Sequence, residues 1–356
     1  MFLGIDTGQG TTDILLWDQQ SPLENALQFV IPSASSRLAR RISSTDGDIY
    51  CHGNVMGGIP LVKVLKEKIQ AGSQVFMTKE AAMSIRYHPD FVEAIGIKIL
   101  EPETPPPENV TSFITGDFDF PWLLGVFEEA LGEKPAIDQV GLAVQDHGLH
   151  EKTRLARETR LEFYKERLLE SKNLLNLGFR EGIPSRFPRL RAAWLEKEKA
   201  LPNTKHFIID TSPAAIIGAL QDEQILQEQN NVPKTVINFG NGHTLVCIIS
   251  ASNEVIALFE HHTGRIKQPG KFDSYLKEFF TGKLSSKKVI EDHGHGVYYL
   301  GSVPSESSEN IVAIGPNRSL GKESAYEMVY ANPGGSMMMA GPIAMAKALE
   351  EEELER

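Results

Sequence analysis

The stretch Gly4-Ile5-Asp6-Thr7-Gly8-Gln9-Gly10-Thr11-Thr12-Asp13-Ile14-Leu15-Leu16-Trp17 decides the fold of this 356-residue chain. Its apolar arms, Phe2–Ile5 and Ile14–Trp17, predict two strands joined by a glycine-rich turn. Glycine allows the backbone to adopt positive φ and to approach a ligand closely. Successive backbone N–H groups in such a turn form an anion-binding nest. We therefore expect a phosphate-binding β-hairpin over residues 4–17.

Several side chains of this hairpin are candidate ligands for a phosphate and its metal ion. Asp6 ends an apolar strand and would hold Mg²⁺ through water. Thr11 and Thr12 add hydroxyl donors. The alternative is an ordinary hairpin with a glycine turn, but such a turn does not need an acidic residue and two threonines. The candidates for phosphate contact are Gly8, Gln9, Gly10, Thr11 and Thr12.

A second segment has the same strand–Gly-x-Gly–strand pattern. Residues 236–246 read Val-Ile-Asn-Phe-Gly-Asn-Gly-His-Thr-Leu-Val, so Asn238 stands where the first copy has Asp6. An asparagine can hydrogen-bond a metal-bound water, but it is neutral and cannot act as a base. Asn238 is therefore a second candidate metal residue. The candidates for phosphate contact in this turn are Gly240, Asn241, Gly242 and His243.

The first hairpin resembles the motif Asp-x-Gly-x-Gly-Thr-x-Asp of the actin, sugar-kinase and heat-shock-chaperone ATPase superfamily, and the second hairpin is similar to the second copy found there. The resemblance implies an α/β fold with two ribonuclease H-like (actin-like ATPase) domains flanking a nucleotide cleft. It also implies ATP and Mg²⁺ as cofactors, and phosphoryl transfer or ATP hydrolysis as the chemistry.

Further segments resemble the same superfamily in chain order. Asp210–Leu220, rich in small residues, is similar to the connecting helix that is crossed by a second helix at the domain hinge. Residues 332–336, Asn-Pro-Gly-Gly-Ser, resemble the adenosine motif. The resemblance makes Gly334, Gly335 and Ser336 candidates for contact with the nucleoside.

Residues 140–148 resemble the strand and turn of carbohydrate kinases that carry Gln-x-His-Gly beside the sugar, here Gln145, His147 and Gly148. In those kinases the catalytic base is an aspartate at the position that Ser212 occupies here. Asp210, two residues earlier, or His147 would then act on the nucleophile. Together with Asp6 they form the candidate catalytic set.

Strands and helices alternate in two blocks, which indicates two α/β domains with a cleft between them. We expect an N-terminal actin-like ATPase domain over 1–149, a charged helical insertion over 150–204 and a C-terminal actin-like ATPase domain over 205–356. The run Glu151–Lys172 is rich in Glu, Arg and Lys with leucines at helical spacing. It is either a solvated insertion, or a cap over a cleft or a surface for a partner.

Composition excludes several classes of protein. The net charge is −11 and there is no long Lys/Arg run, so nucleic acid is not an expected partner. No apolar run approaches the ~20 residues needed to cross a bilayer, so we expect no membrane partner and a cytoplasmic location. The two cysteines, Cys51 and Cys247, exclude a disulfide scaffold and a Cys-rich metal site. They also exclude a radical enzyme with three thiolates on an iron–sulfur cluster.

Three groups of histidines are candidate metal or proton-transfer sites: His147 with His150, Glu260-His261-His262, and Asp292-His293-Gly294-His295. The alternative is surface or packed histidines without a ligand. Neighbouring side chains on a strand point to opposite faces, so His261 and His262 cannot easily share an ion. His293 and His295 can do so if that segment is extended.

Three functions remain open at this stage: a kinase acting on an unidentified small molecule, an ATP-driven activator of a partner protein, and a catalytically silent nucleotide-binding sensor. The chain also resembles a family labelled pyruvate formate-lyase activating enzyme-like (DUF1786). The two-cysteine count does not fit the radical chemistry that this label suggests.

Overall fold

The computed structural model describes residues 1–150, 156–228 and 232–355, and its strands form three sheets. The first sheet has the order β3-β2-β1-β8-β9. Its strands are β1 (Phe2–Thr7), β2 (Thr11–Trp17), β3 (Leu27–Pro32), β8 (Gln139–Val144) and β9 (Lys205–Ile209). β1, β2 and β3 pair antiparallel, whereas β1, β8 and β9 pair parallel.

The second sheet repeats this arrangement. Its order is β13-β12-β11-β10-β14-β15. The strands are β10 (Lys234–Phe239), β11 (His243–Ile249), β12 (Val255–His262), β13 (Gly296–Tyr299), β14 (Ile311–Ile314) and β15 (Val329–Tyr330). Again three consecutive strands, β10 to β12, pair antiparallel, and β10 pairs parallel with β14, which pairs parallel with β15; β13 adds an antiparallel edge strand beside β12. The order 3-2-1-4-5, present twice, is the ribonuclease H-like arrangement, so the expected fold class is confirmed.

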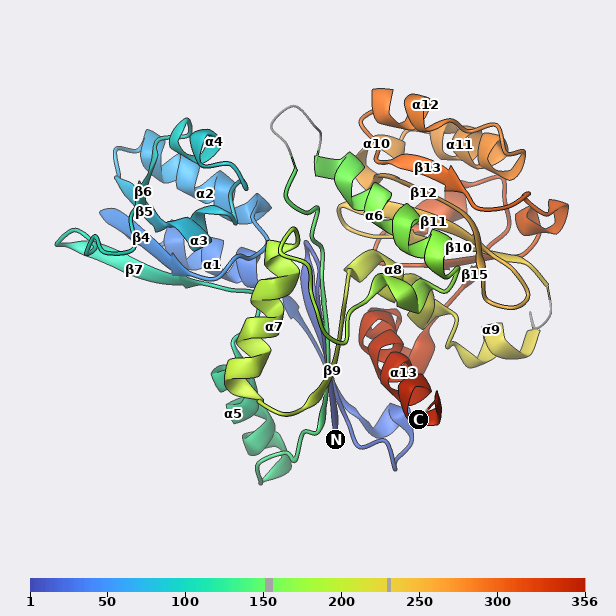
Figure 1. Ribbon diagram of the computed structural model, residues 1–356, viewed down its shortest axis with the longest axis horizontal. Coiled ribbons are helices and arrows are strands. Elements are labelled where there is room, and N and C mark those ends of the chain that lie inside the picture. Colours follow the sequence, from blue (N-terminus) through green and yellow to red (C-terminus); the bar gives the residue numbers. More distant parts are fainter. Residues whose placement is uncertain (151–155, 229–231, 356) are drawn as a thin grey trace.

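Helices cover both faces of these sheets (Figure 1). α5 (Phe120–Leu131) and α7 (Pro188–Ala200) lie on one side of the first sheet, and α13 (Ala340–Glu355) packs on its other side. α8 (Thr211–Ala219) packs against β10, β11 and β14 of the second sheet. The outer face of that sheet carries α10 (Thr263–Ile266), α11 (Lys271–Phe280) and α12 (Ser286–Glu291).

α8 and α13 cross closely between the two sheets. A Cβ added at Gly218 would collide with the backbone of Ala340, so the crossing depends on the missing side chain. The small-residue segment Asp210–Leu220 therefore has the packing expected of it. α8 ends at Ala219, and α9 (Glu223–Glu228) begins after a break.

A third sheet, with the order β6-β5-β4-β7, lies between β3 and β8 in the chain. All its strands are parallel: β4 (Asp48–Gly53), β5 (Val75–Thr78), β6 (Ile97–Leu100) and β7 (Val110–Thr115). It carries α1 (Ala34–Ser43), α2 (Ile59–Gln70), α3 (Lys79–Ala82) and α4 (Pro89–Glu93). Cys51 is buried in β4. Figure 1 shows this unit facing the second sheet across the molecule.

Two expectations about domain boundaries differ from the structure. The boundary at residue 205 assigns β9 to the C-terminal domain, but β9 pairs with β8 in the first sheet. The C-terminal helix α13 also packs on β1 and β8 of that sheet. β9 is the edge strand of the first sheet, and its partner β8 lies about sixty residues earlier in the chain. Local sequence carries no signal for a pairing between strands so far apart.

The helix α6 (Ala156–Glu170) in the expected insertion is not solvated. Arg160, Leu161, Phe163, Tyr164 and Leu168 are buried. α6 lies against β13 and the segment before α7, which makes it a connecting element between the two halves. The interpretation as a solvated insertion is wrong for this part of the run, because one face of the charged helix is apolar. Residues 151–155 of the same run lie outside the described part of the chain.

Candidate nucleotide site

The two glycine turns lie against each other. The first joins β1 to β2 through residues 8–10, and the second joins β10 to β11 through residues 240–242. A Cβ added at Gly10 would collide with the side chain of Asn241. A Cβ added at Gly242 would collide with the side-chain oxygen of Gln9. Glycine at these two positions therefore allows each turn to accept a side chain from the other.

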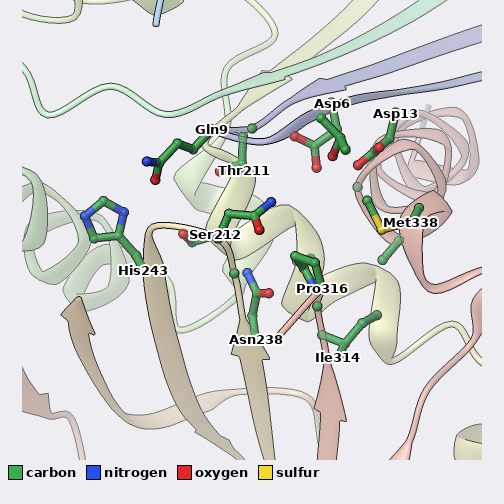
Figure 2. A pocket seen from close by; sticks show the side chains of 18 of the residues that line it. Asp6, Gln9, Asp13, Thr211, Ser212, Asn238, His243, Ile314, Pro316 and Met338 are labelled. Carbon is green, nitrogen blue, oxygen red and sulfur yellow. The ribbon is translucent and has the colours of Figure 1, made fainter. Parts of the chain in front are cut away.

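Both turns line one cavity, which we call the turn cavity (Figure 2). Of the residues expected from the sequence, its lining includes Asp6, Gly8, Gln9, Thr11, Asn238, Gly240, Asn241, Gly242 and His243. Gly10 and Thr12 are not in that lining. Thr12 is buried, and its hydroxyl lies 3.3 Å from the Thr7 hydroxyl inside the hairpin. Residues of both turns thus line the same cavity.

Asp6 and Asp13 form a pair of buried carboxyl groups in this cavity. They are directly opposite each other in the register of β1 and β2. Their Oδ1 atoms are buried and have no hydrogen-bond partner among the described residues. Burial, and then the neighbouring Asp13, raise the pKa of Asp6 well above its usual value, and burial raises the pKa of Asp13 to about 7. A cation bound next to both carboxylates would stabilise their ionised forms, which burial and mutual repulsion otherwise disfavour.

The donor set of this pair fits Mg²⁺, which takes one or two carboxylates and keeps several waters. Figure 2 shows Asp6 and Asp13 side by side on one wall, with Asn238 on another wall. Asp13 was not among the expected site residues, although it ends the quoted motif. The hairpin register alone reveals it, because facing positions on an antiparallel pair point to the same side of the sheet.

A larger cavity of about 640 Å³, here called the large cavity, adjoins the turn cavity. The two share Gly8, Gln9 and Gln145. Its other walls come from residues 55–60 and 83–88 of the third-sheet unit, and from His147, His150, Arg189, His262 and His295. Its size is within the range of small-molecule sites. A ligand there would lie next to a phosphate held by the first turn.

The loop after β8 is fixed in place by a buried carboxylate. Asp146 accepts hydrogen bonds from the Tyr87 hydroxyl at 2.6 Å and from the backbone N–H groups of Gly148, Arg189 and Leu190. Arg189 in turn pairs with Asp117, with its Nε 2.6 Å from an Asp117 oxygen. These contacts hold Gln145 and His147 at the junction of the two cavities.

His147 lies in the large cavity as a neutral imidazole. Burial, and then Arg160 and His243, lower its pKa to about 3. A neutral imidazole at this position can offer a hydrogen bond to the cavity but is only a weak base.

Asp210 has a structural role in this arrangement. Arg160 donates from Nε to Asp210 Oδ2 at 2.9 Å and from a terminal nitrogen to Oδ1 at 2.7 Å. The same guanidinium pairs with Glu260 on β12, and it donates to the Ser212 hydroxyl. Asp210 also caps α8 by accepting from the Ser212 N–H. Both oxygens are engaged, which does not favour the expectation that Asp210 acts on the nucleophile.

The expected nucleoside segment is not part of the turn cavity. Its lining, among the described residues, includes Ile314, Gly315 and Pro316 at the end of β14 but not Gly334, Gly335 or Ser336. Gly334 instead packs against Leu23 and Ile343, with φ +58. The missed signal is an apolar strand followed by glycine, which Ile311–Gly315 has and residues 332–336 lack.

The histidine pairs behave differently from one another. His261 points toward Asp292, with its Nε2 3.1 Å from a carboxylate oxygen, whereas the His262 ring lies near the His243 ring. The expectation that these neighbours face opposite ways is thus met. His293 has φ +65, so the segment to His295 is not extended and the two do not face one point.

Comparisons with known proteins agree with this description. The family model described as "Putative pyruvate format-lyase activating enzyme (DUF1786)" matches residues 56–320. No curated protein matches the sequence.

Solved structures with some similarity include MreB5 of Spiroplasma citri bound to ADP, at 10% identity, with a TM-score of 0.42 over 100% of this chain and 98% of that one. The apo pSK41 ParM protein has 12% identity and a TM-score of 0.36, covering 100% of this chain and 99% of that one. EutJ from Carboxydothermus hydrogenoformans has 10% identity and a TM-score of 0.35, covering 97% and 88%. Such scores are low, and the fold assignment rests on the strand order of the two sheets.

Proposed function

The chain belongs to the DUF1786 family, and we propose that it binds a magnesium nucleotide in the turn cavity and transfers the terminal phosphoryl group to a small molecule in the large cavity. The observation that carries this proposal is the contact between the two glycine turns around a pair of buried carboxylates. ATP is the nucleotide that the superfamily resemblance favours.

Each group has a defined part in this proposal. Gly8, Gln9 and Thr11 on one side and Gly240 to Gly242 on the other would surround the phosphates. Asp6 and Asp13 would hold Mg²⁺ through its water shell. Bound Mg²⁺ neutralises charge on the phosphate oxygens, which supplies much of the rate in such reactions together with positioning. Gln145 and His147 would orient the acceptor at the junction of the cavities.

The family description names an activating enzyme, but the cysteines do not support radical chemistry. The chain has two cysteines, and both are buried. Burial raises the pKa of Cys51 to about 12 and also raises that of Cys247. They are therefore protonated thiols in separate hydrophobic clusters, whereas a cluster needs several thiolates close together.

A second candidate function is an ATP-driven activator of a partner protein. The observation that favours it is Arg160 on α6, which links Asp210 of the first half to Glu260 of the second half. A nucleotide that changed the distance between the halves would act on this link. The exposed side of α6 would then present the change to a partner.

A turnover assay separates these functions. Phosphorylated product from MgATP and a panel of small hydroxyl and carboxyl compounds supports the first function. ATP turnover that occurs only with a copurifying protein supports the second. The control is Asp6→Asn, which should abolish either activity. If MgATP binds but no turnover is seen, even in Asn238→Asp, the chain is a silent sensor and the phosphotransferase proposal is wrong.

A further inference from the structure

Three imidazoles from distant parts of the chain meet beside the junction of the two cavities. His147 follows β8, His243 begins β11 and His295 precedes β13. One ring nitrogen of each lies within 4.8 Å of those of the other two. The centroids of the His243 and His295 rings are 4.6 Å apart, and the His147 ring lies 5.6 Å and 5.7 Å from these two. We call these residues the histidine triad.

The triad contains buried nitrogens that no hydrogen bond satisfies among the described residues. His295 is only 1% exposed, and neither of its ring nitrogens has a partner. Nε2 of His243 is also buried without one. Leaving such atoms unpaired costs free energy, so a buried cluster of them needs an explanation. An ion at their common centre would satisfy them together.

The chemical state of the triad suits a metal ligand. Burial, as the largest cause, lowers the pKa of His147 and of His243 to about 3 and also lowers the pKa of His295. The rings are therefore neutral at physiological pH, and metals bind the neutral form. Positive charge is also tolerated nearby, because Arg160 faces two carboxylates, Asp210 and Glu260. Their formal charges sum to −1.

Groups outside the triad are placed to orient the rings. An oxygen of Glu260 lies 3.8 Å from Nδ1 of His295. The side-chain amide of Gln145 lies 2.7 Å from Nδ1 of His243. The atom at that place is the amide nitrogen Nε2; a half-turn of the amide would put its oxygen there, to accept the Nδ1 proton and leave Nε2 of His243 free to coordinate. Carboxylate or amide partners of this kind fix the tautomer of metal-binding histidines.

We propose that His147, His243 and His295 bind one divalent transition-metal ion, best matched by Zn²⁺, with its open position toward the large cavity. Imidazole nitrogens select such ions over Mg²⁺, which prefers oxygen. Catalytic zinc sites have three protein ligands and keep a fourth coordination position for water or substrate. Nitrogen ligands arranged tetrahedrally around Zn²⁺ at the usual bond length lie about 3.4 Å from one another. The ring nitrogens of the triad, which lie within 4.8 Å of one another, would therefore move closer by roughly 1 Å when the ion binds.

The site rests on different residues from the proposed Mg²⁺ site, although His243 lines the turn cavity as well. An ion at the triad would face a ligand in the large cavity, where His147 and His295 form part of the wall. It would bind an oxygen atom of that ligand, such as a hydroxyl or carboxylate. The acceptor in the proposed phosphoryl transfer would then be an oxygen-bearing small molecule held by this ion.

Titration of metal-free full-length protein with Co²⁺ tests the site, because four-coordinate Co²⁺ has a strong visible absorption. We expect one Co²⁺ per chain, displaced by Zn²⁺. His147→Gln and His295→Gln should each weaken binding by about 10- to 100-fold. His293→Asn is the matched control: it lies two residues from His295 at positive φ, which Asn tolerates, and should bind as the wild type does.

Two further results separate this proposal from the nucleotide proposal. Asp13→Asn should keep the Co²⁺ site while losing the effect of Mg²⁺ on nucleotide binding. Because His295 is buried, a thermal melt of each variant shows whether it is folded, and half-buried His147 gives a variant whose fold is less at risk. Wild-type protein that binds no Co²⁺ at tenfold excess would overturn the proposal. So would folded His147→Gln and His295→Gln proteins that bind as tightly as the wild type.

Discussion

At the scale of single residues, Asp6 and Asp13 carry the main electrostatic cost of the nucleotide site. Burial raises the pKa of both, so the folded state holds protons that the unfolded state releases. For Asp13 this difference extends from about pH 4 to about pH 7. Across that window the folded state binds more protons, so stability falls as pH rises. A bound cation would offset this loss.

Asp13→Asn should therefore raise the Tm of the metal-free protein at pH 8 by a few degrees, since the neutral amide removes the buried charge. It should also reduce the Tm increase that MgATP produces in the wild type. Glu196→Gln is the matched control, because burial raises the pKa of Glu196 to about 8 and this residue does not line the turn cavity. That variant should gain stability at pH 8 and keep the full MgATP effect. An unchanged MgATP effect in Asp13→Asn would contradict the metal role of the pair.

The sequence predicts those residues whose role depends on a local pattern. Gly8, Gln9, Thr11 and the residues of the second turn follow from short motifs, and the structure places them together. The histidine triad could not be predicted, because its members lie far apart in the chain and only the fold brings them together. The segment 332–336 shows the limit of a short motif: a Gly-Gly-Ser string is common, and the structure places it outside the lining of the turn cavity, which Gly315 after β14 joins instead.

At the scale of elements, α6 is the helix whose burial differs most from what its sequence predicts. Its composition suggested a solvated helix, but one face of it buries Arg160 and Tyr164. Average composition cannot show this, because the burial of one guanidinium depends on two carboxylates in other elements. Apolar periodicity, by contrast, is visible in the sequence of a helix such as α2, whose Leu61, Val64 and Leu65 are buried at helical spacing.

Arg160→Met should destabilise the protein by about 3–5 kcal/mol, because it leaves two buried carboxylates without their partner. Chemical denaturation at pH 7 measures this. The control on the same helix is Glu170→Gln, whose ion pair with Arg167 is exposed and worth less than about 1 kcal/mol. A loss below about 1 kcal/mol in Arg160→Met would show that α6 does not tie the two halves together.

At the scale of the whole molecule, the turn cavity is narrow. Its volume is about 90 Å³, below the ~300 Å³ at which small-molecule sites usually begin. We therefore expect the turns to separate when a nucleotide enters, with the α8–α13 crossing as the pivot. The α8–α13 crossing, where Gly218 meets the backbone of Ala340, lies between the two ribonuclease H-like sheets and can serve as that pivot. Among the described residues no helix is long and apolar enough to cross a membrane.

The central claim is that two glycine turns hold one nucleotide between them. Calorimetric titration with MgADP of Gly10→Val, Gly242→Val and a control, Gly264→Val, tests it most directly. A Cβ at Gly10 or Gly242 collides with a side chain of the facing turn, whereas a Cβ at Gly264 has no facing atom within 4 Å. The account predicts one site per wild-type chain, affinity at least about tenfold weaker in either turn variant, and no change in the control. Unchanged affinity in either turn variant would contradict it.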